Sequence, residues 1–85
     1  MLVPKVDNHM TIRVKFFASL REQISDPHTE VDGTQAKTIS DVWKLATDQP
    51  MPPHVLCSVN LDHKEPDAPV ADGDEVAFFP PITGG

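Results

Sequence analysis

The amino-acid sequence predicts a small α+β domain in which one main helix packs on one face of a mixed sheet of four to five strands. Two observations predict this class. Segments of alternating hydrophobic and polar residues precede and follow a single helical pattern, and 85 residues suffice for one domain with one core. A chain this short has too little core to enclose a spacious catalytic cavity.

The first part of the chain predicts two strands joined by a short helical connector. In Thr11–Phe17, hydrophobic residues occupy every second position, as in a half-buried strand. Ala18–Ile24 contains good helix formers, but Ser25-Asp26-Pro27 ends the pattern after one or two turns. Thr29–Val31 has strand propensity and precedes a turn, so we expect a second strand antiparallel to the first.

The main helix is predicted from its N-terminal signal and its spacing. Thr38 followed by Asp41 resembles a capping box, with Asp in place of the usual Glu or Gln. The prolines from Pro50 onward require the helix to end near Asp48. The core face comprises Ile39, Val42, Trp43 and Ala46. We interpret Trp43 as a core residue; the alternative is an exposed aromatic for binding.

The second half of the chain predicts the remaining strands. Val55–Leu61 alternates, which places Val55, Cys57, Val59 and Leu61 on one face. Cys57 is therefore interpreted as a small buried hydrophobe rather than a reactive thiol. Lys64–Val70 is expected to form a loop or a short irregular strand, and Asp72–Asp74 a turn. Glu75–Phe79 has little polar character and predicts a buried, central last strand. This order fits the β-grasp fold best.

Composition excludes several classes of function. Seven basic residues against 13 acidic ones give a net charge of −6, which argues against nucleic acid and anionic membranes as partners. No apolar run reaches the roughly 18 to 20 residues of a membrane span. The single cysteine cannot form an intramolecular disulfide, and we expect a cytoplasmic protein. The acidic last third is either a solvated face or a docking surface for a basic partner.

The sequence also lacks the motifs of an independent enzyme. Its four glycines form no phosphate-binding loop, and its four histidines have no zinc-ligand spacing. We therefore expect no metal and no cofactor bound by this chain, and no catalysis by the chain alone. No serine lies in a nucleophile elbow.

The chain end carries the strongest functional signal. After Phe79, two prolines lack N–H donors and direct the chain away from the sheet, so the last six residues can reach about 20 Å. Gly84 and Gly85 let the terminal carboxylate enter a channel too narrow for other residues. That carboxylate is a poor electrophile until another protein converts it to an acyl adenylate with ATP. Sulfur can then displace the nucleotide and leave a thiocarboxylate on Gly85.

These features divide the chain into three parts. Residues 1–9 show no periodicity and are expected to be a disordered leader or extension. Residues 10–79 are expected to form the β-grasp domain. Residues 80–85 are expected to form an extended Gly-Gly tail, mobile from Thr83 onward in the free protein.

Three segments resemble the small subunit of molybdopterin synthase, a ubiquitin-like β-grasp sulfur carrier. These segments are the strand and connector Ile12–Glu22, the Ser58-Val59-Asn60 stretch, and the ending Asp72–Gly85. The ending Phe-Phe-Pro-Pro-x-x-Gly-Gly is typical of the molybdopterin branch. The thiamine sulfur carrier shares the Gly-Gly terminus but lacks the Phe-Phe-Pro-Pro sequence that leads to it here.

The resemblance implies a role and a set of partners. An E1-like enzyme would adenylate Gly85, and a sulfur donor protein would supply its sulfur. The thiocarboxylate would then donate sulfur to cyclic pyranopterin monophosphate inside the large subunit of a heterotetramer. That large subunit would supply the catalytic residues. The resemblance implies that Gly84 gives clearance and that the partner-binding residues are Phe79, Pro80, Pro81, Ile82, Thr83 and Gly84.

Three other functions remain open at the level of sequence. The chain could be a ubiquitin-like modifier that forms isopeptide bonds through Gly85. It could feed sulfur to thiamine or another pathway. It could also be a β-grasp binding module whose tail has no chemical role.

Overall fold

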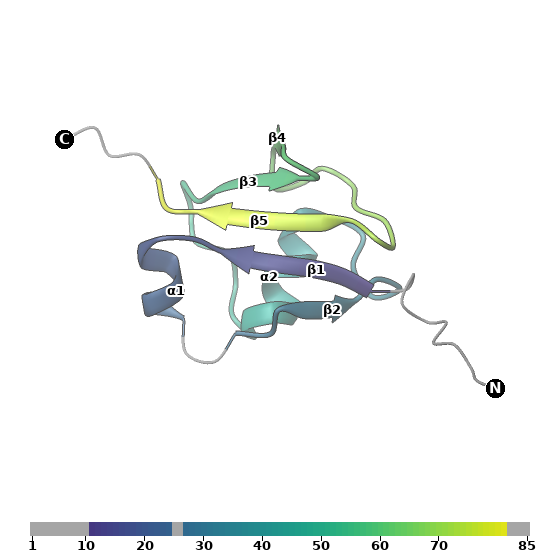
Figure 1. Cartoon of the computed structure of the whole chain (residues 1–85), viewed down its shortest axis with the longest axis horizontal. Helices are drawn as coiled ribbons and strands as arrows, with labels where there is room; N and C mark the ends of the chain where they lie inside the picture. The colour runs from purple at the N-terminus through teal and green to yellow at the C-terminus, as the bar shows by residue number, and fades with distance from the viewer. Residues whose placement is uncertain (1–10, 25–26, 82–85) are drawn as a thin grey trace.

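The structure is a computed structural model that describes residues 11–24 and 27–81. Five strands form one sheet in the order β2-β1-β5-β3-β4, and α2 lies across one of its faces (Figure 1). The elements are β1 (Thr11–Phe16), α1 (Ser19–Gln23), β2 (Glu30–Asp32), α2 (Ile39–Thr47), β3 (Leu56–Val59), β4 (Asp62–Lys64) and β5 (Glu75–Phe79).

The sheet is mixed, as predicted. β1 and β5 are parallel and lie at its centre, while the β1–β2, β3–β5 and β3–β4 pairs are antiparallel. Parallel neighbours need a long crossover connection, and here the chain from β1 to β5 includes α2, which covers one face of the sheet. The predicted α+β fold, with one main helix on one face, is confirmed.

The core lies between α2 and the covered face of the sheet. Three aromatic rings form its centre: Trp43 meets Phe78 edge-on, with ring centroids 4.9 Å apart, and Phe16 packs against both. Edge-to-face and offset arrangements of this kind are favourable for aromatic pairs. Trp43 is 1% exposed, so its interpretation as a core residue is confirmed.

Helix α2 begins where the sequence predicts. The Thr38 side chain accepts a hydrogen bond from the Asp41 backbone N–H, and the Asp41 carboxylate accepts from the Thr38 backbone N–H. This reciprocal capping satisfies two N–H groups that the helix leaves without internal partners. The helix ends at Thr47, and its C-cap Asp48 has a left-handed backbone. The four predicted core-facing residues of the helix are all buried.

The third predicted strand is wrong at its end. Leu61 was predicted to face the core with Val59, but its side chain is 90% exposed. Asn60 and Leu61 both have positive φ, 51° and 73°, so they form a tight turn between β3 and the short strand β4. Positive φ at both central residues is the geometry of a two-residue hairpin turn. The alternating pattern therefore stops at Val59.

The same turn anchors the start of β5. The Asn60 side chain donates to the Asp74 carboxylate (3.0 Å) and accepts from the Glu75 backbone N–H (3.0 Å). Gly73, in the predicted turn before β5, has a φ of 86°, which favours glycine. These contacts fix the register of β5 in the sheet, and the same register continues to its last residue, Phe79.

Candidate functional site

The base of the C-terminal tail is held by the centre of the sheet. β5 lies between β1 and β3 and ends at Phe79. Pro80 and Pro81 follow outside the ladder, and neither has an N–H to continue it. The predicted site residues Ile82, Thr83, Gly84 and Gly85 lie outside the described residues. The domain therefore supplies a fixed point from which the tail begins.

Two Phe-Phe doublets place aromatic rings on both faces of the sheet at this point. In the parallel register, Phe16 is opposite Phe78, and these two rings stack in the core with centroids 5.4 Å apart. Side chains alternate across a strand, so the next residues, Phe17 and Phe79, lie on the face that α2 leaves open. Their rings stack with centroids 5.0 Å apart and an interplanar angle of 7°.

Two further side chains extend this stack. His63 of β4 stacks on Phe79 with centroids 6.4 Å apart. Leu56, at the start of β3, is directly opposite Phe79 in the antiparallel register and therefore shares its face. We call Phe17, Leu56, His63 and Phe79 the docking face. Phe17 is 41% exposed, and the Phe79 and Leu56 side chains are half-buried.

Small residues lie in the middle of the open face, and charged residues lie beside them. Ala77 and Ser58 are directly opposite each other and are almost fully buried between their larger neighbours. Lys15 forms an ion pair with Glu75, with an Nζ–Oε2 distance of 2.9 Å. The hydrogen bond from Lys15 lowers the pKa of Glu75, and the charge of Lys15 acts in the same direction. Arg13 is directly opposite Glu75 in the parallel register, and its charge also lowers the pKa of Glu75.

Among the described residues, the thiol of Cys57 is buried, and the His63 imidazole stacks beside the tail base. Among residues 11–24 and 27–81, no three His, Cys, Asp or Glu side chains are grouped to hold a metal ion. Cys57 is 2% exposed, and burial raises the pKa of its thiol, with a smaller contribution from the Glu65 charge. The interpretation of Cys57 as a buried hydrophobe is confirmed.

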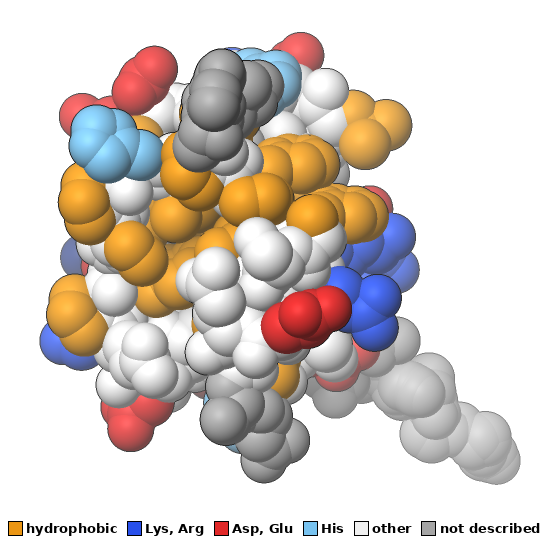
Figure 2. All heavy atoms as spheres, turned by 90° about the vertical axis from the view of Figure 1, so that its left-hand side faces the viewer, with side chains coloured by type: hydrophobic (Ala, Val, Ile, Leu, Met, Phe, Trp, Pro, Cys, Tyr) orange, Lys and Arg blue, Asp and Glu red, His pale blue; other side chains and the backbone are white. Residues whose placement is uncertain are grey.

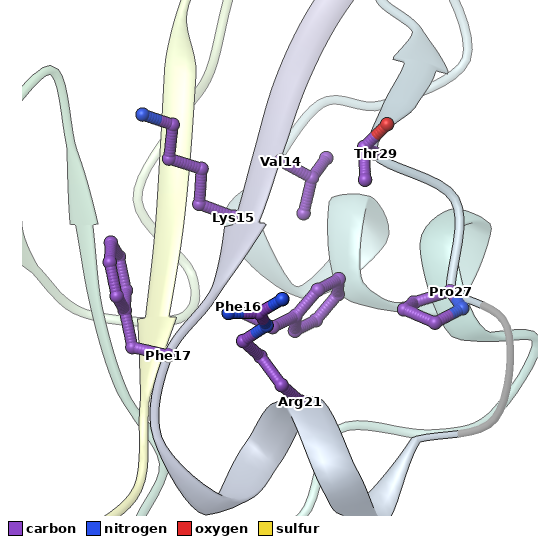
Figure 3. Close-up of a pocket in the computed structure, with 7 residues that line it drawn as sticks. All are labelled: Val14, Lys15, Phe16, Phe17, Arg21, Pro27 and Thr29. Atoms are coloured by element: carbon purple, nitrogen blue, oxygen red, sulfur yellow. The ribbon is translucent and has the colours of Figure 1, made fainter.

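A hollow of about 470 Å³ lies beside the end of β1. The β1–β2 ladder ends at the Arg13–Glu30 pair, and the Val14 backbone N–H donates to the Thr29 carbonyl just beyond it. In Figure 3, Arg21 extends from α1 toward Phe16, while Lys15 and Phe17 lie on the opposite side of the strand. The hollow is lined by Val14, Lys15, Phe16, Phe17, Arg21, Pro27 and Thr29. It holds no nucleophile paired with a base.

Sequence reasoning found part of this site. Phe79, Pro80 and Pro81 lie at the base of the tail, and their role in partner binding stays a prediction. Phe17, Leu56 and His63 were not predicted as site residues. The doublets Phe16-Phe17 and Phe78-Phe79 are the sequence feature from which Phe17 could have been predicted. Parallel pairing of their strands puts one pair of rings on each face of the sheet.

A five-stranded mixed sheet with one main helix across one face defines the class of ubiquitin-like β-grasp proteins. The fold likeness is direct: SAMP1, a small archaeal modifier protein from Haloferax volcanii, superposes with a TM-score of 0.65 at 25% identity, covering 88% of this chain and 99% of that one.

The chain belongs to the ThiS family, which matches residues 14–85. The molybdopterin synthase sulfur carrier subunit of Escherichia coli is 41% identical over 87% of this chain and 99% of its own length. The corresponding subunit of Haemophilus influenzae is 31% identical over the same shares. The family recognised from the sequence is confirmed. Among the described residues, no helix has the length and apolar character needed to span a membrane.

Proposed function

We propose that this chain is the sulfur carrier subunit of a molybdopterin synthase and that it acts in the cytoplasm. The similarity to two curated sulfur carrier subunits along nearly their whole length carries the proposal. The structure supports it with a rigid domain whose central strand ends at the base of the tail. The chain provides a carrier group and a docking surface, while the large subunit provides the catalytic residues.

Gly85 carries the chemistry, and its loading takes two steps. Its carboxylate oxygen attacks the α-phosphate of ATP on an E1-like enzyme, which forms the acyl adenylate and releases pyrophosphate. Sulfide (HS⁻) supplied by a donor protein then attacks the acyl carbon; the bond from that carbon to the AMP oxygen breaks, AMP leaves with the former carboxylate oxygen, and the thiol proton is released to solvent. The resulting thiocarboxylate is the sulfur nucleophile that serves cyclic pyranopterin monophosphate in the large subunit. ATP is bound by the activating enzyme, and this chain binds no cofactor of its own.

The domain positions this reactive end. Pro80 and Pro81 have a fixed φ, which lowers the entropy lost when the tail enters a partner. Gly84 carries no side chain that could block a narrow channel. The docking face meets the partner beside the tail base, where its stacked aromatic rings are suited to burial in an interface. Two such pairs around a large-subunit dimer give the proposed heterotetramer.

Deletion of Gly85 tests the proposal. The truncated chain should fold and dock on the large subunit with nearly unchanged affinity, because the domain and docking face are intact. It should transfer no sulfur to the pterin precursor in a reconstituted reaction. Sulfur transfer that survives the deletion contradicts the proposal. A strain lacking the chain should require molybdenum cofactor products; a requirement for thiamine instead would indicate a carrier for that pathway.

A second candidate function is protein modification through Gly85. The fold likeness to an archaeal modifier protein favours it, although the curated relatives are sulfur carriers. Peptides with a lysine joined to Ile82-Thr83-Gly84-Gly85 in digests of host lysate would support this function. Their absence alongside active sulfur transfer would leave the sulfur carrier as the function.

A further inference from the structure

The two longest stretches without Asp, Glu, Lys or Arg are residues 49–61 and 76–85. They are unusual in a chain of which 24% is charged. The second stretch contains most of β5 and the tail. The first contains β3 and the loop before it, in which Pro50, Met51, Pro52 and Pro53 are consecutive; we call these four residues the proline loop. Burial in the core explains β3, but it does not explain the proline loop.

The proline loop and the tail base lie at the same end of the molecule. The antiparallel register puts Leu56, the first residue of β3, directly opposite Phe79, the last residue of β5. The loop joins α2 to β3 at this end, where β5 also finishes (Figure 1). Figure 2 looks onto this end and shows hydrophobic side chains gathered across it.

The proline loop is exposed but anchored at both sides. Pro50, Pro52 and Pro53 are exposed, whereas Met51 is partly buried and packs against the core. Val55, just after the loop, is buried. Pro52 and Pro53 restrict the backbone between these two anchors, and Pro50 restricts it just before Met51. An exposed apolar segment that is already ordered loses little entropy when a partner covers it, and depletion of charge is what distinguishes the core of an interface.

We infer that the proline loop is a second contact surface for the large subunit, continuous with the docking face around the tail base. This inference rests on the proposed function. The matching surface on the large subunit is uncharged and carries aromatic side chains, because aromatic-lined grooves are the usual receptors for exposed prolines. The large subunit is the occupant because the proline loop adjoins the docking face at the end where β5 finishes, and the relatives of this chain are subunits of molybdopterin synthase.

A pair of matched substitutions tests the inference. Pro53→Glu puts a carboxylate on the proposed contact surface. Pro66→Glu makes the same chemical change at an exposed proline near the start of α2, where the Pro66 carbonyl accepts from the Ser40 backbone N–H. That site is at the opposite end of α2 from the proline loop. Thermal unfolding of both variants verifies that each domain remains folded.

Binding to the large subunit is then measured by calorimetry for the unmodified chain and both variants. The inference predicts that Pro53→Glu weakens the affinity about tenfold or more, that Pro66→Glu leaves it nearly unchanged, and that the activating enzyme binds all three chains similarly. Equal affinities of the two variants for the large subunit overturn the inference. A selective loss of affinity for the activating enzyme overturns the choice of partner.

Failure of the inference is distinguishable from failure of the proposed function. If the unmodified chain transfers sulfur and Pro53→Glu binds like Pro66→Glu, the function stands and the proline loop has no contact role. If the unmodified chain neither binds the large subunit nor transfers sulfur, the proposed function itself is wrong.

Discussion

Phe17 and Phe79 stack almost face to face on the open side of the sheet, with centroids 5.0 Å apart. Phe79 is the last residue of β5, and Phe17 directly follows β1. Their stacking joins the tail base to the neighbouring strand, and the Phe17 backbone N–H also donates to the Phe78 carbonyl (3.0 Å). The aromatic face and the start of the tail therefore form one rigid unit.

This unit predicts a loss of partner binding when Phe17 is truncated. Phe17→Ala removes the half-exposed ring that stacks on Phe79 in the docking face, and we expect affinity for the large subunit to fall about tenfold or more. Leu61→Ala is the control, because Leu61 is an exposed hydrophobic residue in the β3–β4 turn, away from the docking face. Calorimetric titration compares the two. Equal affinities of the two variants for the large subunit would show that the docking face does not contact it.

Asp41 predicts a pH dependence of stability. Its carboxylate accepts from the backbone N–H groups of Lys37 and Thr38, and the bond from Lys37 is the largest cause of its lowered pKa. A lowered pKa in the folded state stabilises the fold above the ordinary Asp pKa, and this stabilisation is lost as pH falls through the folded value. Asp41→Asn should therefore cost about 0.5 kcal/mol at neutral pH.

Urea unfolding at neutral pH and at about pH 3 measures this effect. The difference in unfolding free energy between the unmodified chain and Asp41→Asn should shrink at the lower pH, because the Asp41 carboxylate of the unfolded chain is protonated there more readily than that of the folded chain. A difference that stays constant would show that the capping carboxylate does not contribute through its charge.

Cys57 should be unreactive in the folded protein. Its side chain is 2% exposed, and burial raises the pKa of its thiol, which disfavours the reactive thiolate. We expect a thiol reagent to label Cys57 at the rate of domain opening and fully in urea. Rapid labelling without denaturant would contradict this packing. It would also suggest that Cys57 could carry sulfur in place of Gly85.

The central elements could be predicted from sequence because their signals are local. The alternation in β1 and the capping pair Thr38 and Asp41 each lie within a few residues and have one structural solution. The uncharged run before Pro80 likewise predicts a buried last strand, and β5 is central.

The end of β3 could not be predicted because its pattern is misleading. Leu61 continues the alternation of Val59, yet it lies in a turn at positive φ, where leucine gives no turn signal. β4 (Asp62–Lys64) consists of exposed polar residues at the sheet edge. Without a buried face it has no hydrophobic periodicity to detect.

The docking face could not be predicted from sequence for a different reason. Phe17, Leu56 and His63 come from three separate segments, and only the strand order brings them beside Phe79. The tail itself could be recognised from sequence because its prolines and glycines are consecutive. Long-range pairing is therefore the information that a single sequence conveys least directly.

Gly84 should be required for loading the tail rather than for docking. Gly84→Val adds a branched side chain next to the reactive carboxylate, so we expect slow adenylation by the activating enzyme and nearly unchanged affinity for the large subunit. Thr83→Val is the control, because it makes a small change one position further from the end. Pyrophosphate release measures adenylation. Equal rates for the two variants would contradict a narrow channel around Gly84.

The central claim is that Gly85 carries sulfur. The most direct measurement is the intact mass of the chain after incubation with its activating enzyme, ATP and a sulfur source, followed by fragmentation to locate any change. The account predicts a mass gain equal to the exchange of one oxygen for sulfur, confined to Gly85. Adenylation without that gain, or a gain on Cys57 instead, would contradict it.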